Sequence, residues 1–256
     1  MRIAVITGAS SGMGWEFAKQ ISLWDTFDEM WVIARREDRL QQLAAELSIK
    51  TRIIPMDLTK QESFAAYERM LSEQKPFVAA LINCSGYGKF GAYDEIPTED
   101  QCGMIDLNCK ALVMLTALTL PYMGEGSRVI QVDSLSAFQP VPCLGVYAAT
   151  KAFVLSYSRS LQQEVRARGI RVVAVCPGWV ETEFFTRARQ TNDSVISYFN
   201  VVYQAKDVVH TALRDAYKTK KDLSIHGFQV KAQVLLVKLL PHRLVMWIWK
   251  KQQKIK

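Results

Sequence analysis

The sequence predicts an α/β protein in which helices cover both faces of one parallel sheet. Short apolar runs alternate with longer helical patterns up to about residue 176, and the first apolar run ends in a glycine-rich turn. Strands that alternate with helices form parallel sheets through right-handed crossovers, which bring helices to both faces. No change of composition divides the 256 residues, so we expect a single doubly wound domain followed by a helical tail.

The expected elements follow one another without a long break. The strands are short apolar runs, and turn or charged residues end the first three of them at Gly8, Arg35 and Asp57. In chain order we expect strand 3–6, helix 14–23, strand 30–34, helix 39–47, strand 51–56, helix 64–72, strand 79–83, helix 103–120, strand 128–132, helix 147–168 and strand 170–176. The helix at 103–120 is apolar on nearly all sides, which is typical of a helix buried on more than one face.

The turn after the first strand is typical of a dinucleotide site. Its sequence, TGASSGMG, joins a strand to a helix, and in this context glycines let the backbone approach a pyrophosphate. The start of the helix adds free N–H groups and the positive end of its dipole. We expect the cofactor to contact Gly8, Ser10, Ser11, Gly12, Met13 and Gly14. The alternative is an ordinary glycine turn, and the spacing G-x-x-x-G-x-G differs from the more common G-x-G-x-x-G.

Two arginines after the second strand indicate which nicotinamide cofactor is used. An acid at this place would bind the ribose 2′-hydroxyl of NAD, whereas an arginine can bind the 2′-phosphate of NADP through a fork of hydrogen bonds. The chain has Arg35 and Arg36 here, and its first acid comes at Glu37. We therefore predict NADP(H). In the alternative, both arginines are simply solvated at the start of a helix.

A tyrosine and a lysine four residues apart supply the candidate chemistry. In the segment YAATK, Tyr147 and Lys151 lie on one face of the expected helix, and Ser134 precedes the tyrosine by 13 residues. An ammonium near a phenol stabilises the phenolate, so we expect a lowered tyrosine pKa and a group that passes a proton to or from a carbonyl oxygen. Taken alone the spacing is a weak signal, because chance often produces such pairs on surface helices.

These segments, in this order, resemble the classical short-chain dehydrogenase/reductase family. The matching motifs run from TGASSGMG to PGWVET at 177–182 and span about 70% of the chain. The resemblance implies a Rossmann-like fold, a nicotinamide cofactor and carbonyl–alcohol chemistry. It also implies a homodimer or homotetramer formed through the helices at 103–120 and 147–168.

The resemblance assigns roles to individual residues. Hydride from NADPH would reach a ketone carbon, Tyr147 would give a proton to the ketone oxygen, and Ser134 would hold that oxygen. Lys151 would lower the tyrosine pKa and bind the nicotinamide ribose, and Asn108 would position a water beside Lys151. The other implied cofactor contacts are Asp57 and Leu58 near the adenine, Asn83 and Gly86 near its ribose, and Pro177, Gly178, Val180 and Thr182 after the last strand, with Thr182 at the carboxamide.

The departures from the family pattern are small. Cys84 and Ser85 stand where the family often has Asn and Ala, and Asp133 precedes the catalytic serine where a small residue is common. All four catalytic positions are present. This favours an enzyme over the alternative, a non-catalytic protein that senses NADP(H) on the same fold.

An aromatic segment after Thr182 is the expected substrate lid, at about 183–204. Apolar and aromatic lining predicts an apolar carbonyl compound, such as a steroid, an acyl chain or an aromatic ketone. The candidate substrate contacts are Ser136, Phe138, Leu144, Trp179, Phe184 and Phe185. In the alternative, these aromatic residues belong to the ordinary core.

Residues 229–256 form a basic tail to the catalytic domain, which we expect at 1–228. The tail holds seven of the 32 Lys and Arg and no acid, so 25 cations balance 25 acids in the body, which gives no indication of nucleic-acid binding. Apolar stretches at 234–240 and 244–249, divided by Pro241, predict two amphipathic helices too short to span a membrane. We expect them to pack on the body or on a partner subunit. The alternative is contact with an anionic membrane surface.

Cysteine usage and the start of the chain bear on location. The five cysteines include no C-x-x-C and no zinc-like set, so we expect free thiols and no metal site. Met1 and Arg2 lead directly into an apolar strand, so no signal peptide is expected. A reducing cytoplasm is therefore the predicted location.

Overall fold

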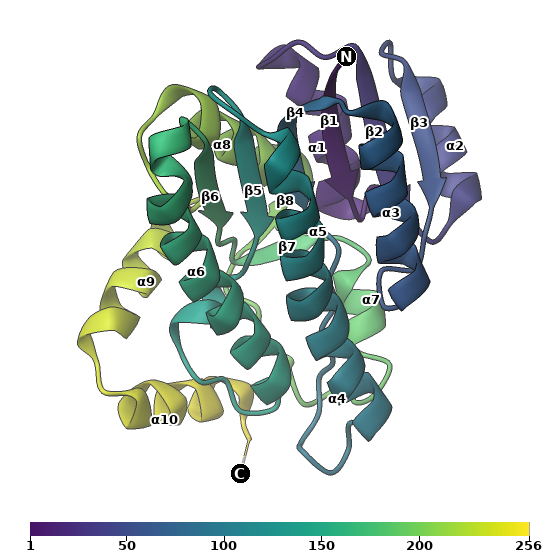
Figure 1. Ribbon diagram of the computed structural model, residues 1–256. Helices are drawn as coiled ribbons and strands as arrows, with labels where there is room; N and C mark the ends of the chain where they lie inside the picture. Colours follow the sequence, from purple (N-terminus) through teal and green to yellow (C-terminus); the bar gives the residue numbers. More distant parts are fainter. Residues whose placement is uncertain (256) are drawn as a thin grey trace.

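Seven strands form one parallel sheet in the order β3-β2-β1-β4-β5-β6-β9 (Figure 1). The computed structural model describes residues 1–255. The strands of this sheet are β1 (Arg2–Thr7), β2 (Glu29–Ala34), β3 (Thr51–Pro55), β4 (Phe77–Asn83), β5 (Arg128–Val132), β6 (Arg171–Val175) and β9 (Leu223–Ser224). A second, two-stranded sheet pairs β7 (Trp179–Glu181) with β8 (Val202–Gln204). The strand order reverses between β1 and β4, and such a reversal opens a crevice at the carboxyl ends of the strands.

Two layers of helices cover the sheet. Successive side chains of a strand point to opposite faces, so Ala4 and Ile6 pack with α1, α2 and α8, whereas Ile3 and Val5 pack with α3, α5 and α6. Figure 1 shows α3, α5 and α6 along the near face of the sheet. The helices are α1 (Gly12–Gln20), α2 (Glu37–Glu46), α3 (Gln61–Gln74), α4 (Thr98–Ile105), α5 (Leu112–Thr119), α6 (Gly145–Val165), α7 (Phe184–Ala188), α8 (Ala205–Lys218), α9 (Phe228–Leu239) and α10 (His242–Gln253).

The predicted order of strands and helices is confirmed as far as residue 176, with bounds that differ by a few residues. Five elements between that point and the tail were not predicted: β7, α7, β8, α8 and β9. Helix α8 buries Val208, Val209 and Leu213 and packs beside α1. Strand β9 pairs with β6 through two residues, and a strand this short leaves no periodic pattern in the sequence.

The predicted helix at 103–120 is part of a continuous helical run, Thr98–Tyr122. Its middle segment, Asp106–Ala111, is a π-helical turn between α4 and α5, and it carries Asn108. Turns of this kind occur frequently at functional sites. Among residues 1–255 this run is the one helix long and apolar enough to cross a membrane, yet it packs against β4 and α6 as a helix of the core.

The basic tail forms two helices, α9 and α10, which a proline divides as predicted. The indole Nε1 of Trp249 donates to the carbonyl oxygen of Pro142 at 3.0 Å. The side-chain oxygen of Gln253 accepts from the backbone N–H groups of Ser197 and Tyr198, both at 2.9 Å. One face of the tail therefore packs on the body, which is the first of the two arrangements expected from the sequence.

Candidate active site

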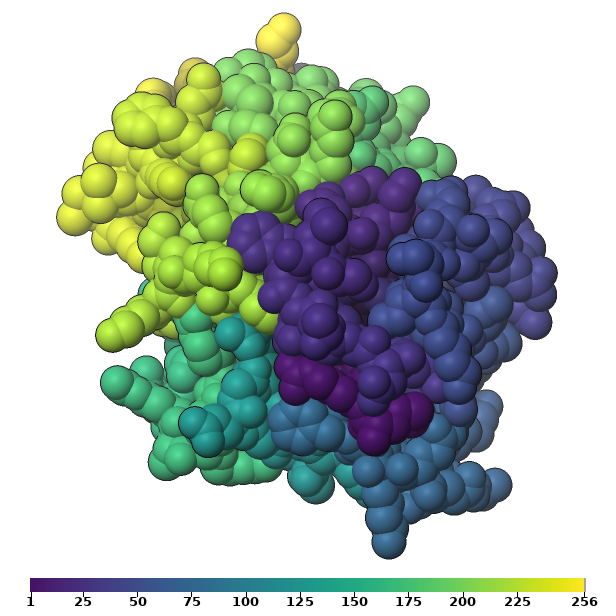
Figure 2. All heavy atoms as spheres, turned by 90° about the horizontal axis from the view of Figure 1, so that it is seen from above, coloured from purple at the N-terminus to yellow at the C-terminus, as the bar shows by residue number. Residues whose placement is uncertain are grey.

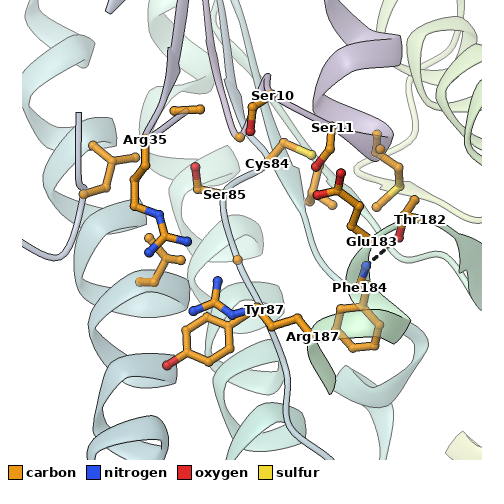
Figure 3. Close-up of a pocket in the computed structure, with 18 of the residues that line it drawn as sticks. Ser10, Ser11, Arg35, Cys84, Ser85, Tyr87, Thr182, Glu183, Phe184 and Arg187 are labelled. Carbon is orange, nitrogen blue, oxygen red and sulfur yellow. Dashed lines mark hydrogen bonds between the residues drawn. The ribbon is translucent and has the colours of Figure 1, made fainter. Parts of the chain in front are cut away.

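A cavity of about 390 Å³ opens at the carboxyl ends of the central strands, on the side where the crevice is expected (Figure 3). The turns after β1, β2 and β4 form one wall, and the segment from β7 to α7 forms the other. The predicted cofactor contacts that line it are Gly8, Ser10, Ser11, Gly12, Met13, Arg35, Arg36, Asp57, Leu58, Gly86, Tyr147, Lys151 and Thr182. The cavity thus joins segments that lie far apart in the sequence.

The glycine turn brings backbone against backbone at the floor of this cavity. Gly8 and Gly12 have φ of 67° and 54°, a region that side chains strongly disfavour. A Cβ on Gly14 would lie 2.2 Å from the carbonyl oxygen of Gly8, so only glycine fits there. Helix α1 begins at this point, and its first N–H groups and dipole favour an anion.

Arg36 ties the end of β2 to the start of the segment expected to form the lid. Its guanidinium forms an ion pair with Glu183 at 2.7 Å and donates to the Ser10 hydroxyl at 3.2 Å. The hydrogen bond that the Glu183 carboxylate accepts from Arg36 lowers the pKa of Glu183. Arg36 therefore already has an anionic partner within the chain.

Arg35 reaches into the cavity toward a second arginine that sequence reasoning missed. Figure 3 shows Arg35 and Arg187 extending toward the same region above Tyr87. The Arg187 guanidinium lies 3.5 Å from the centroid of the Tyr87 ring. Burial and the nearby charge of Arg35 both lower the pKa of Arg187. Arg187 lies in the segment expected to form the lid, where only aromatic residues were predicted to line the site.

Asp57 and Asn83 differ in their relation to the cavity. Asp57 lines it and accepts hydrogen bonds from the Thr59 backbone and hydroxyl at 3.0 and 2.8 Å. Burial raises the pKa of Asp57, but these hydrogen bonds and the charge of Arg35 outweigh it and lower the pKa overall. Asn83 lies beneath the cavity instead and donates to Thr116 and Gln131, so its side chain is not among the lining groups.

Ser134, Tyr147 and Lys151 come together beside the cavity. The Ser134 hydroxyl oxygen accepts from the Ser136 N–H at 3.2 Å, and the Ser134 side chain acts to lower the pKa of the Tyr147 phenol. The Lys151 ammonium donates to the carbonyl oxygen of Val132 at 2.8 Å and lies 5.7 Å from the centroid of the Tyr147 ring. Tyr147 and Lys151 both line the cavity.

The electrostatics of Tyr147 differ from the expectation. Burial raises the pKa of its phenol, and the Ser134 side chain offsets this only in part. Burial also lowers the pKa of Lys151. The pKa of Tyr147 is therefore raised and not lowered as expected, because the loss of water around the phenol and the nearby Asp133 outweigh the effect of Ser134. At neutral pH Tyr147 carries its proton, which is the form that a proton donor needs.

Asn108 is fully engaged with the chain around it. Its side-chain oxygen accepts from the Tyr87 N–H at 3.0 Å. Its amide donates to the Tyr87 carbonyl at 2.9 Å and to the Thr150 hydroxyl at 3.0 Å. A Cβ on Gly86 would lie 3.0 Å from the Asn108 oxygen and 3.8 Å from the Lys151 ammonium, so both groups border that glycine. In this arrangement Asn108 fixes the backbone at Tyr87, and the expected water beside Lys151 stays a prediction.

Asp133 is a buried carboxyl between Lys151 and Cys176. It is 2% exposed, and the Cys176 thiol donates to one of its oxygens at 3.6 Å. Among the described residues, its other oxygen has no hydrogen-bond partner. Burial raises the pKa of Asp133 to about 8, although the charge of Lys151 acts in the opposite direction. The unusual acid noted in the sequence therefore lies at the centre of the site.

A smaller cavity of about 110 Å³ adjoins the first. Its lining includes the expected substrate contacts Ser136, Leu144, Trp179 and Phe184. The residues Met13, Asp133, Tyr147, Thr182 and Phe184 line both cavities. Three predicted cofactor contacts, Pro177, Gly178 and Val180, line only the smaller cavity.

Two predicted substrate contacts lie outside this lining. Phe185 packs between Trp179 and Phe199, with ring centroids 5.7 and 5.1 Å away, and so belongs to an apolar cluster that includes residues of the expected lid. Phe138 lies under the ammonium of Lys238 on the tail. The prediction of substrate contact is wrong for this arrangement of both residues, because aromatic composition does not tell core from lining.

Two residues of the tail line the smaller cavity, and no pattern in the sequence predicted them there. They are Gln233 of α9 and Trp249 of α10. Nothing in the local pattern of a terminal helix indicates that it closes a distant pocket.

Within residues 1–255, no group of three or more His, Cys, Asp or Glu is arranged to hold a metal ion.

The fold and the two adjoining cavities together define a dinucleotide-binding oxidoreductase on a Rossmann-like sheet. Residues 2–193 match the family described as short chain dehydrogenase. The chain belongs to the short-chain dehydrogenase/reductase family.

Known relatives cover most of the chain. It is 33% identical over 201 residues to sulfoacetaldehyde reductase 2 of Chromohalobacter salexigens, which covers 76% of this chain and 79% of that protein. A solved short-chain dehydrogenase from Sphingobium yanoikuyae in complex with NADPH has a TM-score of 0.80 and 28% identity, covering 96% of this chain and 95% of that one. The bulky-bulky ketone specific alcohol dehydrogenase from Comamonas testosteroni has a TM-score of 0.72 and 26% identity, covering 93% and 92%. Other structures of the same fold hold NAD or NADH.

Proposed function

We propose that the protein transfers hydride reversibly between NADPH and an apolar ketone or secondary alcohol, with Tyr147 as general acid and base. The observation that carries this proposal is the position of Tyr147 in the wall shared by the two cavities. A phenol placed there can reach a carbonyl oxygen held in the smaller cavity while a nicotinamide lies in the larger one.

The residues of the larger cavity fit a nicotinamide dinucleotide. The glycine turn leaves no room for a side chain at Gly14, and the exposed start of α1 suits a pyrophosphate. When bound, the cofactor supplies or accepts the hydride. Thr182 lines both cavities and closes this end of the site opposite Gly12, whose Cβ would lie 2.9 Å from the Thr182 methyl group.

The proton steps belong to the chain itself. As negative charge develops on the ketone oxygen, the phenol of Tyr147 donates its proton and the Ser134 hydroxyl donates a hydrogen bond. The Lys151 ammonium, held by the Val132 carbonyl, stabilises the phenolate that remains. The Phe184 ring, 5.3 Å from the Tyr147 ring, keeps water from the phenol and strengthens these interactions. In oxidation the same groups act in reverse.

Two arginines support NADPH as the preferred cofactor. Arg35 and Arg187 line the same cavity, and two guanidinium groups suit a phosphate better than a neutral ribose hydroxyl. Arg36 is a weaker candidate than the sequence suggests, because Glu183 already pairs with it.

Removing the Arg35 charge should weaken NADPH selectively. We expect Arg35→Ala to raise the KM for NADPH by about tenfold or more and to change the KM for NADH little, since a charge-assisted hydrogen bond contributes about 1.5–3 kcal/mol. Steady-state kinetics with both cofactors provide the measurement. Arg69→Ala, which removes an exposed arginine of α3, is the matched control. A wild-type kcat/KM that is higher with NADH would contradict the assignment.

The lining of the smaller cavity supports an apolar substrate. Leu144, Val141, Trp179 and Phe184 border the space next to Tyr147. A related structure is named for bulky ketones, whereas a relative of similar identity is named for sulfoacetaldehyde, a small anion. The apolar lining favours the first of these substrate classes.

A substrate panel tests the proposed function. We expect NADPH consumption with aromatic ketones, ketosteroids or long-chain ketones at a higher kcat/KM than with sulfoacetaldehyde. If the protein binds NADPH but turns over no member of the panel in either direction, the non-catalytic sensor becomes the better reading. If sulfoacetaldehyde is the best substrate, the proposed substrate class is wrong while the reaction stands.

We also propose a homo-oligomer built through α4, α5 and α6. The exposed side chains of Ile105 and Phe153 lie on this region, and Phe153 stacks on Tyr157 with ring centroids 6.2 Å apart. Apolar side chains exposed on adjacent helices suit a partner with the same surface. Members of the family form oligomers in general.

The cytoplasmic location stays a prediction.

A further inference from the structure

The tail helices α9 and α10 are covered by the body on one face only. Their inner faces bury Val230, Val234 and Val237 on α9, and Val245 and Trp249 on α10. These positions recur at three- and four-residue spacing, so each helix has one defined inner side. In Figure 2 the tail, coloured yellow, forms a corner at the edge of the molecule.

The opposite side of α9 exposes large apolar residues among cations. Phe228, Leu235 and Leu239 are 84, 61 and 73% exposed. Their spacing places them on one stripe of the helix, and Lys231 falls on the same stripe. A soluble surface rarely carries three exposed apolar side chains on a single stripe of one helix.

Helix α10 repeats this composition. Leu244 and Trp247 are 41 and 58% exposed, and Lys251 lies four residues after the tryptophan. The Lys251 ammonium is 5.8 Å from the centroid of the Trp247 ring. An exposed tryptophan flanked by leucine and lysine is typical of a helix that lies in a lipid interface.

We propose that the outer face of α9 and α10 binds an anionic lipid surface and holds the substrate cavity against it. Residues 229–256 contain seven cations and no acid, so the tail is complementary to anionic headgroups, and each cation near the surface contributes about 1 kcal/mol. The same face would repel a second copy, because a symmetric contact would set the cations of one tail against those of the other. Each helix has 12 residues and an inner face engaged with the body, so the tail lies on the surface and does not span it.

The position of the tail connects lipid binding to the site. Gln233 and Trp249, on the inner side of the same helices, line the smaller cavity. An apolar ketone dissolved in the lipid would thus enter the pocket close to the helices that touch the membrane. This delivery of substrate rests on the proposed function, whereas lipid binding itself does not.

The test uses the full chain and two kinds of vesicle, phosphatidylcholine alone and equal parts of phosphatidylcholine and phosphatidylglycerol. We expect co-sedimentation with the anionic vesicles, little with the neutral ones, and weaker binding as salt is raised. The variant Leu235→Ser/Leu239→Ser/Trp247→Ser should bind about tenfold or more weakly. Its substitutions are at exposed positions, so the thermal unfolding temperature should change little. The control Leu23→Ser/Tyr93→Ser removes two apolar residues that are 78 and 87% exposed elsewhere, and it should bind like the wild type.

Two outcomes overturn the proposal. One is a wild-type chain that does not sediment with anionic vesicles, or a tail variant that sediments as well as the wild type. The other is a tail variant that loses its dimer or tetramer mass by light scattering, which would make the face a subunit interface. NADPH turnover on a water-soluble ketone should be equal in wild type and tail variant. Absence of that turnover in both, with lipid binding intact, would instead count against the proposed function alone.

Discussion

Tyr147→Phe should lower kcat by about 10²–10⁴-fold, the usual contribution of a positioned general acid. The substitution removes one hydroxyl and keeps the ring, which packs 5.3 Å from Phe184 between the two cavities. The Kd for NADPH should stay nearly unchanged, because the substitution leaves intact the groups proposed to bind the cofactor phosphates. These groups are the glycine turn, Arg35 and Arg187. Stopped-flow or steady-state rates, together with fluorescence titration of NADPH, give the two quantities.

Tyr157→Phe is the matched control for this experiment. Tyr157 lies on the same helix, is half-buried and stacks on Phe153. Its loss should leave kcat and the Kd for NADPH at wild-type values. A Tyr147→Phe enzyme that keeps more than about a tenth of wild-type kcat would show that another group donates the proton.

Gly14→Ala should abolish measurable NADPH binding and lower the thermal unfolding temperature. The added Cβ would lie 2.2 Å from the Gly8 carbonyl oxygen and 2.6 Å from its carbon, both in the backbone. Backbone atoms cannot rotate away as a side chain can, so the turn and the start of α1 must separate. Overpacking of this kind typically costs about 1–3 kcal/mol of stability and here distorts the surface offered to the pyrophosphate. Thermal unfolding and NADPH titration measure the two effects separately.

Gly124→Ala provides the comparison for that change. The nearest atom to its added Cβ is the Phe77 ring at 3.4 Å, an ordinary contact, and its φ is not positive. We expect cofactor binding at the wild-type level. If Gly14→Ala bound NADPH as tightly as this control, the glycine turn would not be the pyrophosphate site.

Local sequence patterns predicted the parts of the site that are formed by residues close together in the sequence. The glycine turn, the arginines after β2 and the Tyr147–Lys151 pair each depend on spacing that the sequence displays directly. The strands were predictable for the same reason, since a buried parallel strand is an apolar run. The short strands β7, β8 and β9 and the helices α7 and α8 were not predicted.

Long-range contacts set the features that the sequence did not reveal. Arg187 and Arg35 come together only because the tertiary fold brings α7 and the end of β2 to the same cavity. The Asn83 amide donates to Thr116 and Gln131. Its side chain therefore does not line the cavity, although residues 84–86, which follow it directly, do. The raised pKa of Tyr147 depends on how completely surrounding segments exclude water, which no spacing encodes. An acid at position 133 departs from the family pattern, which the sequence shows directly. The contact of the buried Asp133 carboxyl with the Cys176 thiol depends on the tertiary fold, which the sequence does not show.

The family motifs and two residues that line the smaller cavity lie in different parts of the chain, and this bears on how related proteins come to differ. The match to the family ends at residue 193, whereas Gln233 and Trp249, which line the smaller cavity, lie beyond it. Relatives can therefore share every catalytic motif and still present different walls to their substrates. Exchanging the C-terminal helices between relatives becomes a route to new substrate preference that leaves the proton donor and the cofactor site untouched.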